Sequence, residues 1–440
     1  MRRSFAHAGR AWRARRRLAP LAAVALAMAG CGDGGSGGPA GTPAQGTDRP
    51  GPPSDEAQLE ALLERRAEAL QAGRVSRYAA TAAGALRAED RRAARNARGL
   101  PLRAVRLKAT SIEVDGRRAV LEVRSGYAIT GIDGRYEADR TLRALRTPGG
   151  WRIRSQASRR QRHPWEVARF AAERSAHFTI LAPAGLATDG LGDALESGYQ
   201  QMREILVSGR LRRRYLVVVA ADAAQARRMT AGIRGVATLA AISDAAVSEQ
   251  GPAERVLKVA SQRLLVVWPA FGPLDPDGRQ RVVAHELTHA ALAGQTSGRT
   301  PGWLVEGLAL YVSGDRRVAE AASRVGEQAL GGGAAGSAAR RALTLTGLSR
   351  PEAIGRLGGD GQSAAYAYSS AAAVYITARF GRKRFFDLYD AFNEESLDGP
   401  AGAELTSRAV RRTLGVPLVE LERDLRRWIV TRAVVDAFAP

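Results

Sequence analysis

The chain has 440 residues, of which 66 are lysine or arginine and 44 are aspartate or glutamate, so its formal net charge at pH 7 is +22. This length is too great for one ordinary domain, and 45% hydrophobic with 25% charged residues excludes wholesale disorder. The single cysteine excludes an internal disulfide framework. A multi-span membrane protein is excluded because the sequence has no apolar run of about eighteen residues.

Residues 1–30 have the layout of a secretory signal peptide. Seven arginines precede the short apolar run 18–28, which is too short to span a bilayer. Ala29 and Gly30 then lead into Cys31, and this arrangement resembles a bacterial lipobox. The resemblance implies a lipid on Cys31 and a place on the outer face of the bacterial cytoplasmic membrane. The alternatives are plain cleavage and secretion with a free thiol, and export by a twin-arginine route through Arg2 and Arg3.

Two folded regions are expected after this signal. Residues 31–54 are rich in Gly, Pro, Ser and Thr and predict a flexible tether. We place the first domain at residues 55–160 and the second at residues 161–440. The excess of arginine favours an anionic envelope surface as a partner. No nucleic-acid partner is expected, because no helix-turn-helix, RNP or zinc-finger pattern is present.

The first domain combines helices with an antiparallel sheet. Ser54 is a candidate N-cap for a helix with apolar residues at helical spacing, and a second helical stretch over 76–97 bends near Gly84. From Leu102 the apolar period becomes two, with a phase slip between 107 and 112 that predicts a β-bulge. Turn signals at 115–116, 133–134 and 148–150 predict hairpins. This order resembles the NTF2-like cone, for which we expect a spacer role.

The second domain is also expected to mix helices and strands, which makes the whole chain α+β. A helix is predicted over 166–175 and another over 191–207. Strands are predicted over 177–181, 215–220, 236–242 and 264–268, from their continuous or alternating apolar residues.

A metal-binding pattern follows the last of these strands. In the run His285-Glu286-Leu287-Thr288-His289 the two histidines are four residues apart, so on a helix both imidazoles reach one cation. Glu286 lies about 100° further round the helix, where it can address a water on that cation without ligating it. The alternative is a pair of histidines that bind nothing.

A second pattern supplies a third ligand. Glu306 lies in the apolar segment 301–311, where a buried carboxylate is costly unless it meets a cation or a strong donor. Two imidazoles and one carboxylate complete a His₂Glu site with an open fourth position, which is the catalytic form of zinc coordination. One zinc ion per chain is therefore expected.

The two patterns together resemble the gluzincin metallopeptidases of the MA-like group, whose segments read HExxH and then WLxEGxA. The resemblance implies a zincin-type α+β domain, zinc ligands at His285, His289 and Glu306, and a general base at Glu286. It also implies a tyrosine that supports the oxyanion, for which Tyr366 is the first candidate and Tyr368 the second. Leu310 stands where thermolysin-like relatives place an aspartate, which argues against that branch. The strand at 236–242 would, by the same analogy, pair with an extended peptide.

The sequence therefore predicts a lipid-anchored zinc metallopeptidase that hydrolyses peptide or protein substrates. The alternative is a tethered binding or envelope-assembly protein whose zinc site is vestigial or structural. The two remaining histidines of the mature chain, His163 and His177, have no ligand partner at useful spacing and are expected to be structural.

Overall fold

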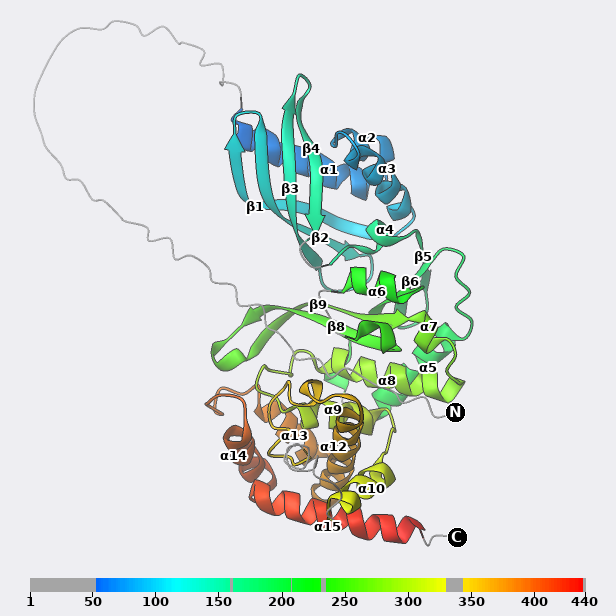
Figure 1. The fold of residues 1–440 in the computed structure, drawn as a ribbon, viewed down its shortest axis with the longest axis vertical. Helices are drawn as coiled ribbons and strands as arrows, with labels where there is room; N and C mark the ends of the chain where they lie inside the picture. The colour runs from blue at the N-terminus through cyan, green and yellow to red at the C-terminus, as the bar shows by residue number, and fades with distance from the viewer. Residues whose placement is uncertain (1–52, 159–160, 207, 231–234, 330–342, 438–440) are drawn as a thin grey trace, which may run out of the picture.

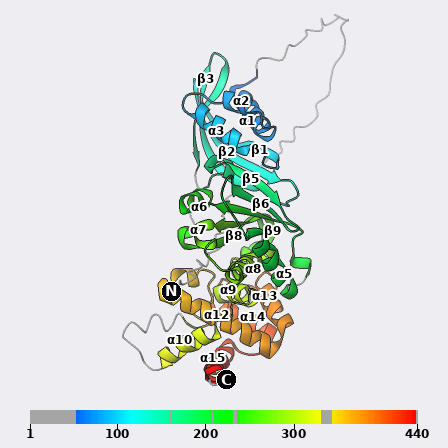
Figure 2. The same cartoon turned by 90° about the vertical axis from the view of Figure 1, so that its right-hand side faces the viewer.

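The computed structural model describes residues 53–158, 161–206, 208–230, 235–329 and 343–437. The expected signal peptide, most of the tether and the candidate lipidation residue Cys31 lie outside these ranges. The structure is α+β, with 48% helix and 25% strand, which confirms the predicted class. Figures 1 and 2 show an elongated molecule with α1–α3 and the first sheet at one end and α15 at the other.

The N-terminal unit (residues 53–158) packs three helices against a four-stranded sheet. The helices are α1 (Asp55–Gln71), α2 (Val75–Ala80) and α3 (Leu86–Ala97). The strands β1 (Leu102–Asp115), β2 (Arg118–Ile129), β3 (Tyr136–Thr147) and β4 (Gly150–Ser158) pair antiparallel in chain order. The Ser54 side chain accepts a hydrogen bond from the backbone N–H of Ala57 at 3.2 Å, so the predicted N-cap is confirmed.

The predicted turns and the bulge of this unit are also confirmed. The strands reverse direction at 115–118, 129–136 and 147–150, the three places with turn signals. The register of β1 against β2 slips between Ala109 and Ser111, inside the interval where the apolar period shifts. Local sequence decides these features because turn conformation and side-chain alternation depend on neighbouring residues.

A second sheet of five strands follows, with the order β5-β6-β7-β9-β8. Its strands are β5 (Phe170–Arg174), β6 (Phe178–Pro183), β7 (Tyr215–Ala220), β8 (Ala241–Gln250) and β9 (Val256–Val267). The three inner strands run parallel and both edge strands run antiparallel to their neighbours. The connecting helices are α4 (Pro164–Val167), α5 (Leu191–Ile205) and α6 (Ala223–Met229), with short 3₁₀ turns η1 (Ser208–Arg210), η2 (Val236–Thr238) and η3 (Pro252–Glu254).

Two predictions for this region were wrong. The helix expected over 166–175 is instead the short α4 followed by edge strand β5, because pairing with β6 overrides local helix propensity. The strand expected over 236–242 is the 3₁₀ turn η2, and β8 begins only at Ala241. The side chains of Val236 and Leu239 are buried although this segment is a turn. A short apolar run by itself does not distinguish a buried turn from a buried strand.

A helical layer covers the other side of the second sheet. It consists of α7 (Trp268–Phe271), α8 (Pro276–Leu292), α9 (Gly302–Val312), α10 (Val318–Ala329), η4 (Ile354–Arg356), α12 (Gly359–Phe380), α13 (Arg382–Ala391), α14 (Ala403–Leu414) and α15 (Leu418–Ala437). None of the helices in the described ranges is long and apolar enough to cross a bilayer. The largest hydrophobic cluster lies between this layer and the sheet.

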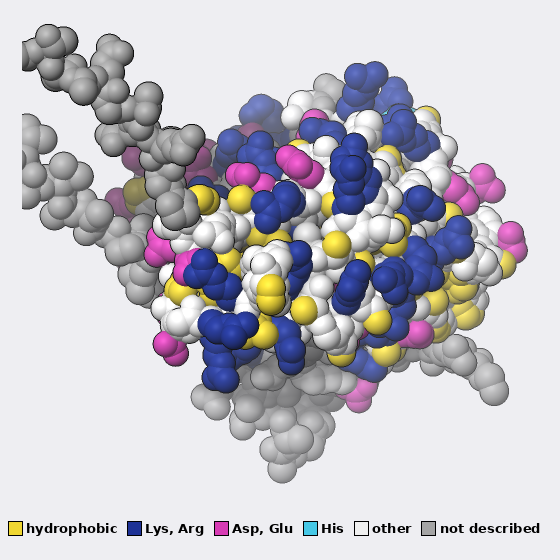
Figure 3. All heavy atoms as spheres, turned by 90° about the horizontal axis from the view of Figure 1, so that it is seen from above, with side chains coloured by type: hydrophobic (Ala, Val, Ile, Leu, Met, Phe, Trp, Pro, Cys, Tyr) yellow, Lys and Arg dark blue, Asp and Glu magenta, His cyan; other side chains and the backbone are white. Residues whose placement is uncertain are grey.

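The N-terminal unit and the second sheet share a hydrophobic cluster. Tyr127 and Tyr136 of the first sheet are buried in the same cluster as Leu216 and Leu265 of the second. The Tyr136 hydroxyl donates to the Gln262 carbonyl at 2.7 Å. Figure 3 looks down the long axis onto the N-terminal unit and shows dark blue arginine and lysine side chains over that end of the molecule.

Candidate metal centre

Helix α8 carries the two histidines and is held tightly against its neighbours. Its N-terminus is capped by Asp275, whose side chain accepts a hydrogen bond from the Gly278 N–H at 2.6 Å. Helix α5 crosses it at Gly198, where an added Cβ would lie 2.5 Å from a side-chain carbon of Val283. Because this approach leaves no room for a side chain, α8 has a fixed position beside the sheet.

Helix α9 carries Glu306 and is itself held in place by a close contact with α12. The next residue, Gly307, faces α12, and a Cβ there would lie 2.6 Å from the Ser369 carbonyl oxygen. Trp303, Leu304 and Leu308 of the same helix are fully buried. The glycine after Glu306 is therefore required by the packing of α9 on α12, a role that sequence analysis did not assign.

The predicted ligands His285, His289 and Glu306 meet in space. The two histidine Nε2 atoms are 3.1 Å apart. Glu306 Oε2 lies 3.4 Å from His285 Nε2 and 3.5 Å from His289 Nε2. The ligand atoms of these three residues are close enough together to share one metal ion. In the described part of the chain, no other group of three or more histidine, cysteine or acidic side chains meets this condition.

The spacing of these three atoms fits zinc. Ligand atoms at about 2.0–2.1 Å from a tetrahedral zinc ion are separated from one another by about 3.3–3.4 Å. The observed separations of 3.1, 3.4 and 3.5 Å surround that value. Glu306 Oε2 is buried and has no hydrogen-bond partner among the described residues, as expected of an oxygen that faces a metal ion.

Electrostatics around Glu306 also favour a cation. Burial by itself works to raise the pKa of this carboxyl, but the adjacent His289 and His285 hold it far below its usual range. Burial lowers the pKa of His289, whereas Glu306 raises it, and the net shift is upward. The carboxylate is thus stabilised as an anion in the interior, where it requires positive charge beside it.

Glu286 lies next to this group but does not join it. Its side chain is only 6% exposed, and its Oε2 accepts a hydrogen bond from the backbone N–H of Ser243 at 2.6 Å. Burial raises the pKa of Glu286, although the Ser243 N–H and the two histidines act in the opposite direction. A carboxylate beside a metal site, held by one backbone donor and directed into a cleft, is suited to accept a proton.

The metal-ligand group and Glu286 open into one cleft, which holds about 970 Å³ of space that is partly open solvent. Its described lining is largely apolar or small, apart from His285, His289, Glu286 and Glu306. The lining residues include Leu239, Ala241, Ile242, Ser243, Ala245, Ala293, Thr296, Val305, Pro351, Ile354 and Tyr366. A cleft with such a lining is suited to contact apolar groups.

The edge strand β8 lies along this cleft. The Ala240 carbonyl accepts a hydrogen bond from the Val267 N–H of β9 at 2.9 Å. Because backbone groups alternate in an antiparallel pair, residues 241, 243 and 245 direct theirs away from β9. All three line the cleft. The exposed strand edge beside the cleft is therefore that of β8, not of the strand predicted at 236–242, and Ser243 is a cleft residue that the sequence did not reveal.

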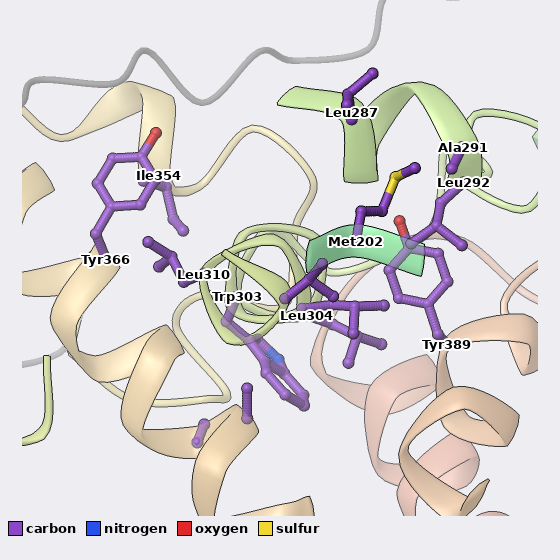
Figure 4. Close-up of a cluster of buried hydrophobic side chains, with 14 of the residues drawn as sticks. Met202, Leu287, Ala291, Leu292, Trp303, Leu304, Leu310, Ile354, Tyr366 and Tyr389 are labelled. Carbon is purple, nitrogen blue, oxygen red and sulfur yellow. The ribbon is translucent and has the colours of Figure 1, made fainter. Parts of the chain in front are cut away.

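The structure separates the two tyrosine candidates. Tyr366 of α12 lines the cleft, and Figure 4 shows its side chain beside that of Ile354. Tyr368 is 2% exposed, makes no hydrogen bond through its hydroxyl, and has the Arg426 guanidinium over its ring at 5.7 Å. Tyr366 is equally buried at 2% exposure, and the difference between the two is that only Tyr366 is among the residues that line the cleft.

The remaining histidines have other partners. His163 is buried and its Nε2 lies 2.7 Å from the Ser125 hydroxyl. His177 pairs through Nδ1 with the Glu196 carboxylate at 2.6 Å. Neither contributes to the metal-ligand group, in agreement with the expectation that both are structural.

Neither a scan against protein-family models nor a search of the curated proteins finds a match to this chain.

Proposed function

We propose that this protein is a zinc peptidase of the gluzincin type, attached to the outer face of a bacterial membrane through a lipid on Cys31. The observation that carries this proposal is the triangle of His285, His289 and Glu306 with the non-ligating Glu286 beside it. A purely structural zinc site has no use for a buried acid held at its edge. The zincin-type α+β architecture of residues 161–440 and the NTF2-like form of residues 55–160 belong to the same proposal.

His285, His289 and Glu306 would hold the ion, and zinc in such a site supplies a Lewis acid for hydrolysis. Glu286 would accept a proton from the attacking water and return it to the leaving amine. The Ser243 N–H orients the Glu286 carboxylate for this exchange. Tyr366, which lines the cleft, would donate a hydrogen bond through its hydroxyl to the oxyanion that develops on the scissile carbonyl.

Substrate binding would use the β8 edge and the apolar lining. An extended peptide that pairs with the outward backbone groups of residues 241 and 245 runs past Glu286. The small and apolar residues of the cleft favour apolar side chains next to the scissile bond and help to exclude water.

The decisive experiment compares the wild type with Glu286→Gln, which keeps the shape of the side chain but removes the base. Both proteins are expected to bind one zinc ion per chain, while peptide-library hydrolysis falls by about 10²–10⁴-fold in the variant. Glu306→Gln is the companion variant and is expected to lose zinc. If wild-type protein holds zinc and cuts no peptide, the binding or envelope-assembly function replaces the enzyme.

A further inference from the structure

An arginine-rich face on helix α3 is not used by the proposed peptidase site. All five of its arginines are exposed, and they are Arg87, Arg91, Arg92, Arg95 and Arg98, the last being the C-cap residue. At about 100° per residue these five positions fall within an arc of about 140°, so they form one face. The remainder of the helix circumference, with Leu86, Ala94 and Ala97, is buried against the rest of the N-terminal unit.

These arginines have no acidic partner in the part of the chain that the structure describes. None of the five forms an ion pair or a side-chain hydrogen bond with any described residue, and Glu89 is the one acid among the exposed side chains of α3. Arg77 of α2 and Arg154 of β4 are exposed as well, and they too have no ion-pair partner among the described residues. The side chain of Arg154 lies near Gly84, just before α3.

In two other arginine-bearing helices, part of the arginines are paired with acids. In α14, Arg408 pairs with Glu404 and Arg412 with Glu394. In α15, Arg423 pairs with Asp424 and Arg426 with Glu422. The high arginine content of the sequence does not by itself produce an unpaired face, because acids at helical spacing can accompany the arginines. On α3 they do not.

We propose that the α3 face docks onto an anionic lipid bilayer. Unpaired guanidinium groups on a rigid helix attract anionic headgroups, and each arginine near such a surface strengthens binding about fivefold. The exposed positions of α3 carry no aromatic side chain that could stack on nucleic-acid bases, which favours lipid over a nucleic acid.

The N-terminal end of the chain supports this choice of partner. Cys31, the candidate lipidation residue, precedes the first described residue, Pro53, by 22 positions. Even fully extended, such a segment spans at most about 75 Å, so a lipid there keeps the N-terminal unit near the membrane. In Figures 1 and 2 this unit lies at one end of the molecule, and the second sheet separates it from the helices around the cleft.

The test uses the mature chain from residue 31 with Cys31→Ser, so that no lipid contributes to binding. Co-sedimentation is measured with phosphatidylcholine vesicles that either contain or lack phosphatidylglycerol. The triple variant Arg91→Gln, Arg92→Gln, Arg95→Gln preserves helix propensity. The matched control changes Arg384, Arg411 and Arg427 to Gln. These three arginines are exposed, have no ion pair or side-chain hydrogen bond in the described chain, and lie on α13–α15.

We expect binding to phosphatidylglycerol vesicles that weakens about a hundredfold in the α3 variant, weakens with added salt and is little changed in the control. Thermal unfolding of both variants should match that of the parent. Equal weakening of the two variants would overturn the proposal, because charge and not the α3 face would then determine binding. Equal binding to neutral vesicles would also overturn it, as would preferential binding of duplex DNA over vesicles.

Discussion

Replacement of Gly307 by alanine tests whether the metal site depends on the close contact between α9 and α12. The new Cβ would lie 2.6 Å from the Ser369 carbonyl oxygen, whereas real Cβ contacts essentially never fall below 3.0 Å. The two helices must therefore separate by at least 0.4 Å, the difference between these values. Metal sites tolerate ligand displacements of only about 0.2 Å, so Glu306 would move out of its place beside the histidines.

We expect this variant to lose about 1–3 kcal/mol of folding free energy, the usual cost of overpacking. Its zinc affinity should fall about 10–100-fold, as when a group that orients a metal ligand is altered. Affinity is measured by competition with a chromophoric chelator, and stability by thermal unfolding of the metal-free protein. Gly192→Ala is the control, since an added Cβ in α5 has nothing within 4 Å.

Unchanged zinc affinity in Gly307→Ala would refute the reasoning. If stability were unchanged as well, α9 and α12 would not approach as closely as 2.6 Å, and the position of Glu306 would have another cause. A loss of stability with intact zinc affinity would locate the effect of Gly307 in packing alone.

Three further predictions concern the cleft and the buried His163, which directly precedes α4. Tyr366→Phe should lower kcat about tenfold or more, because Tyr366 lines the cleft. Tyr368→Phe should leave kcat unchanged, since Tyr368 does not line it. Equal kcat values for both variants would exclude Tyr366 as an oxyanion donor. Proline is tolerated on the edge strand β8, and Ser243→Pro removes the N–H that holds Glu286, so kcat should fall while the zinc content stays unchanged. Ala245→Pro on the same edge should instead act mainly on KM. Burial holds the pKa of His163 well below its usual value. Below about pH 6.5 the unfolded chain therefore binds one more proton than the folded chain. The free energy of unfolding should then fall by up to about 1.4 kcal/mol per pH unit as the pH decreases. Chemical unfolding between neutral and mildly acidic pH checks this, and His163→Gln should flatten the slope; an equally steep slope in that variant would contradict it.

Local sequence predicted the parts of the site that lie within one helix. His285 and His289 share a face because four residues nearly complete one helical turn, and Glu286 lies beside that face for the same reason. The hairpin turns and the β1 bulge of the N-terminal unit were likewise predictable, since each depends on a few neighbouring residues. The meeting of Glu306 with the two histidines was expected from a burial argument and a family resemblance, and the distances in the structure agree with it.

Only the tertiary structure decided the parts that depend on residues distant in sequence. Residues 170–174 became strand β5 because β6 offered backbone partners, and β8 lies at the cleft because it pairs with β9. The Ser243 contact to Glu286, the choice of Tyr366 over Tyr368 and the need for glycine at 307 all arise where separate elements pack together. Helical spacing places side chains around one axis, whereas sheet pairing and helix crossings are determined by which surfaces can be buried against each other.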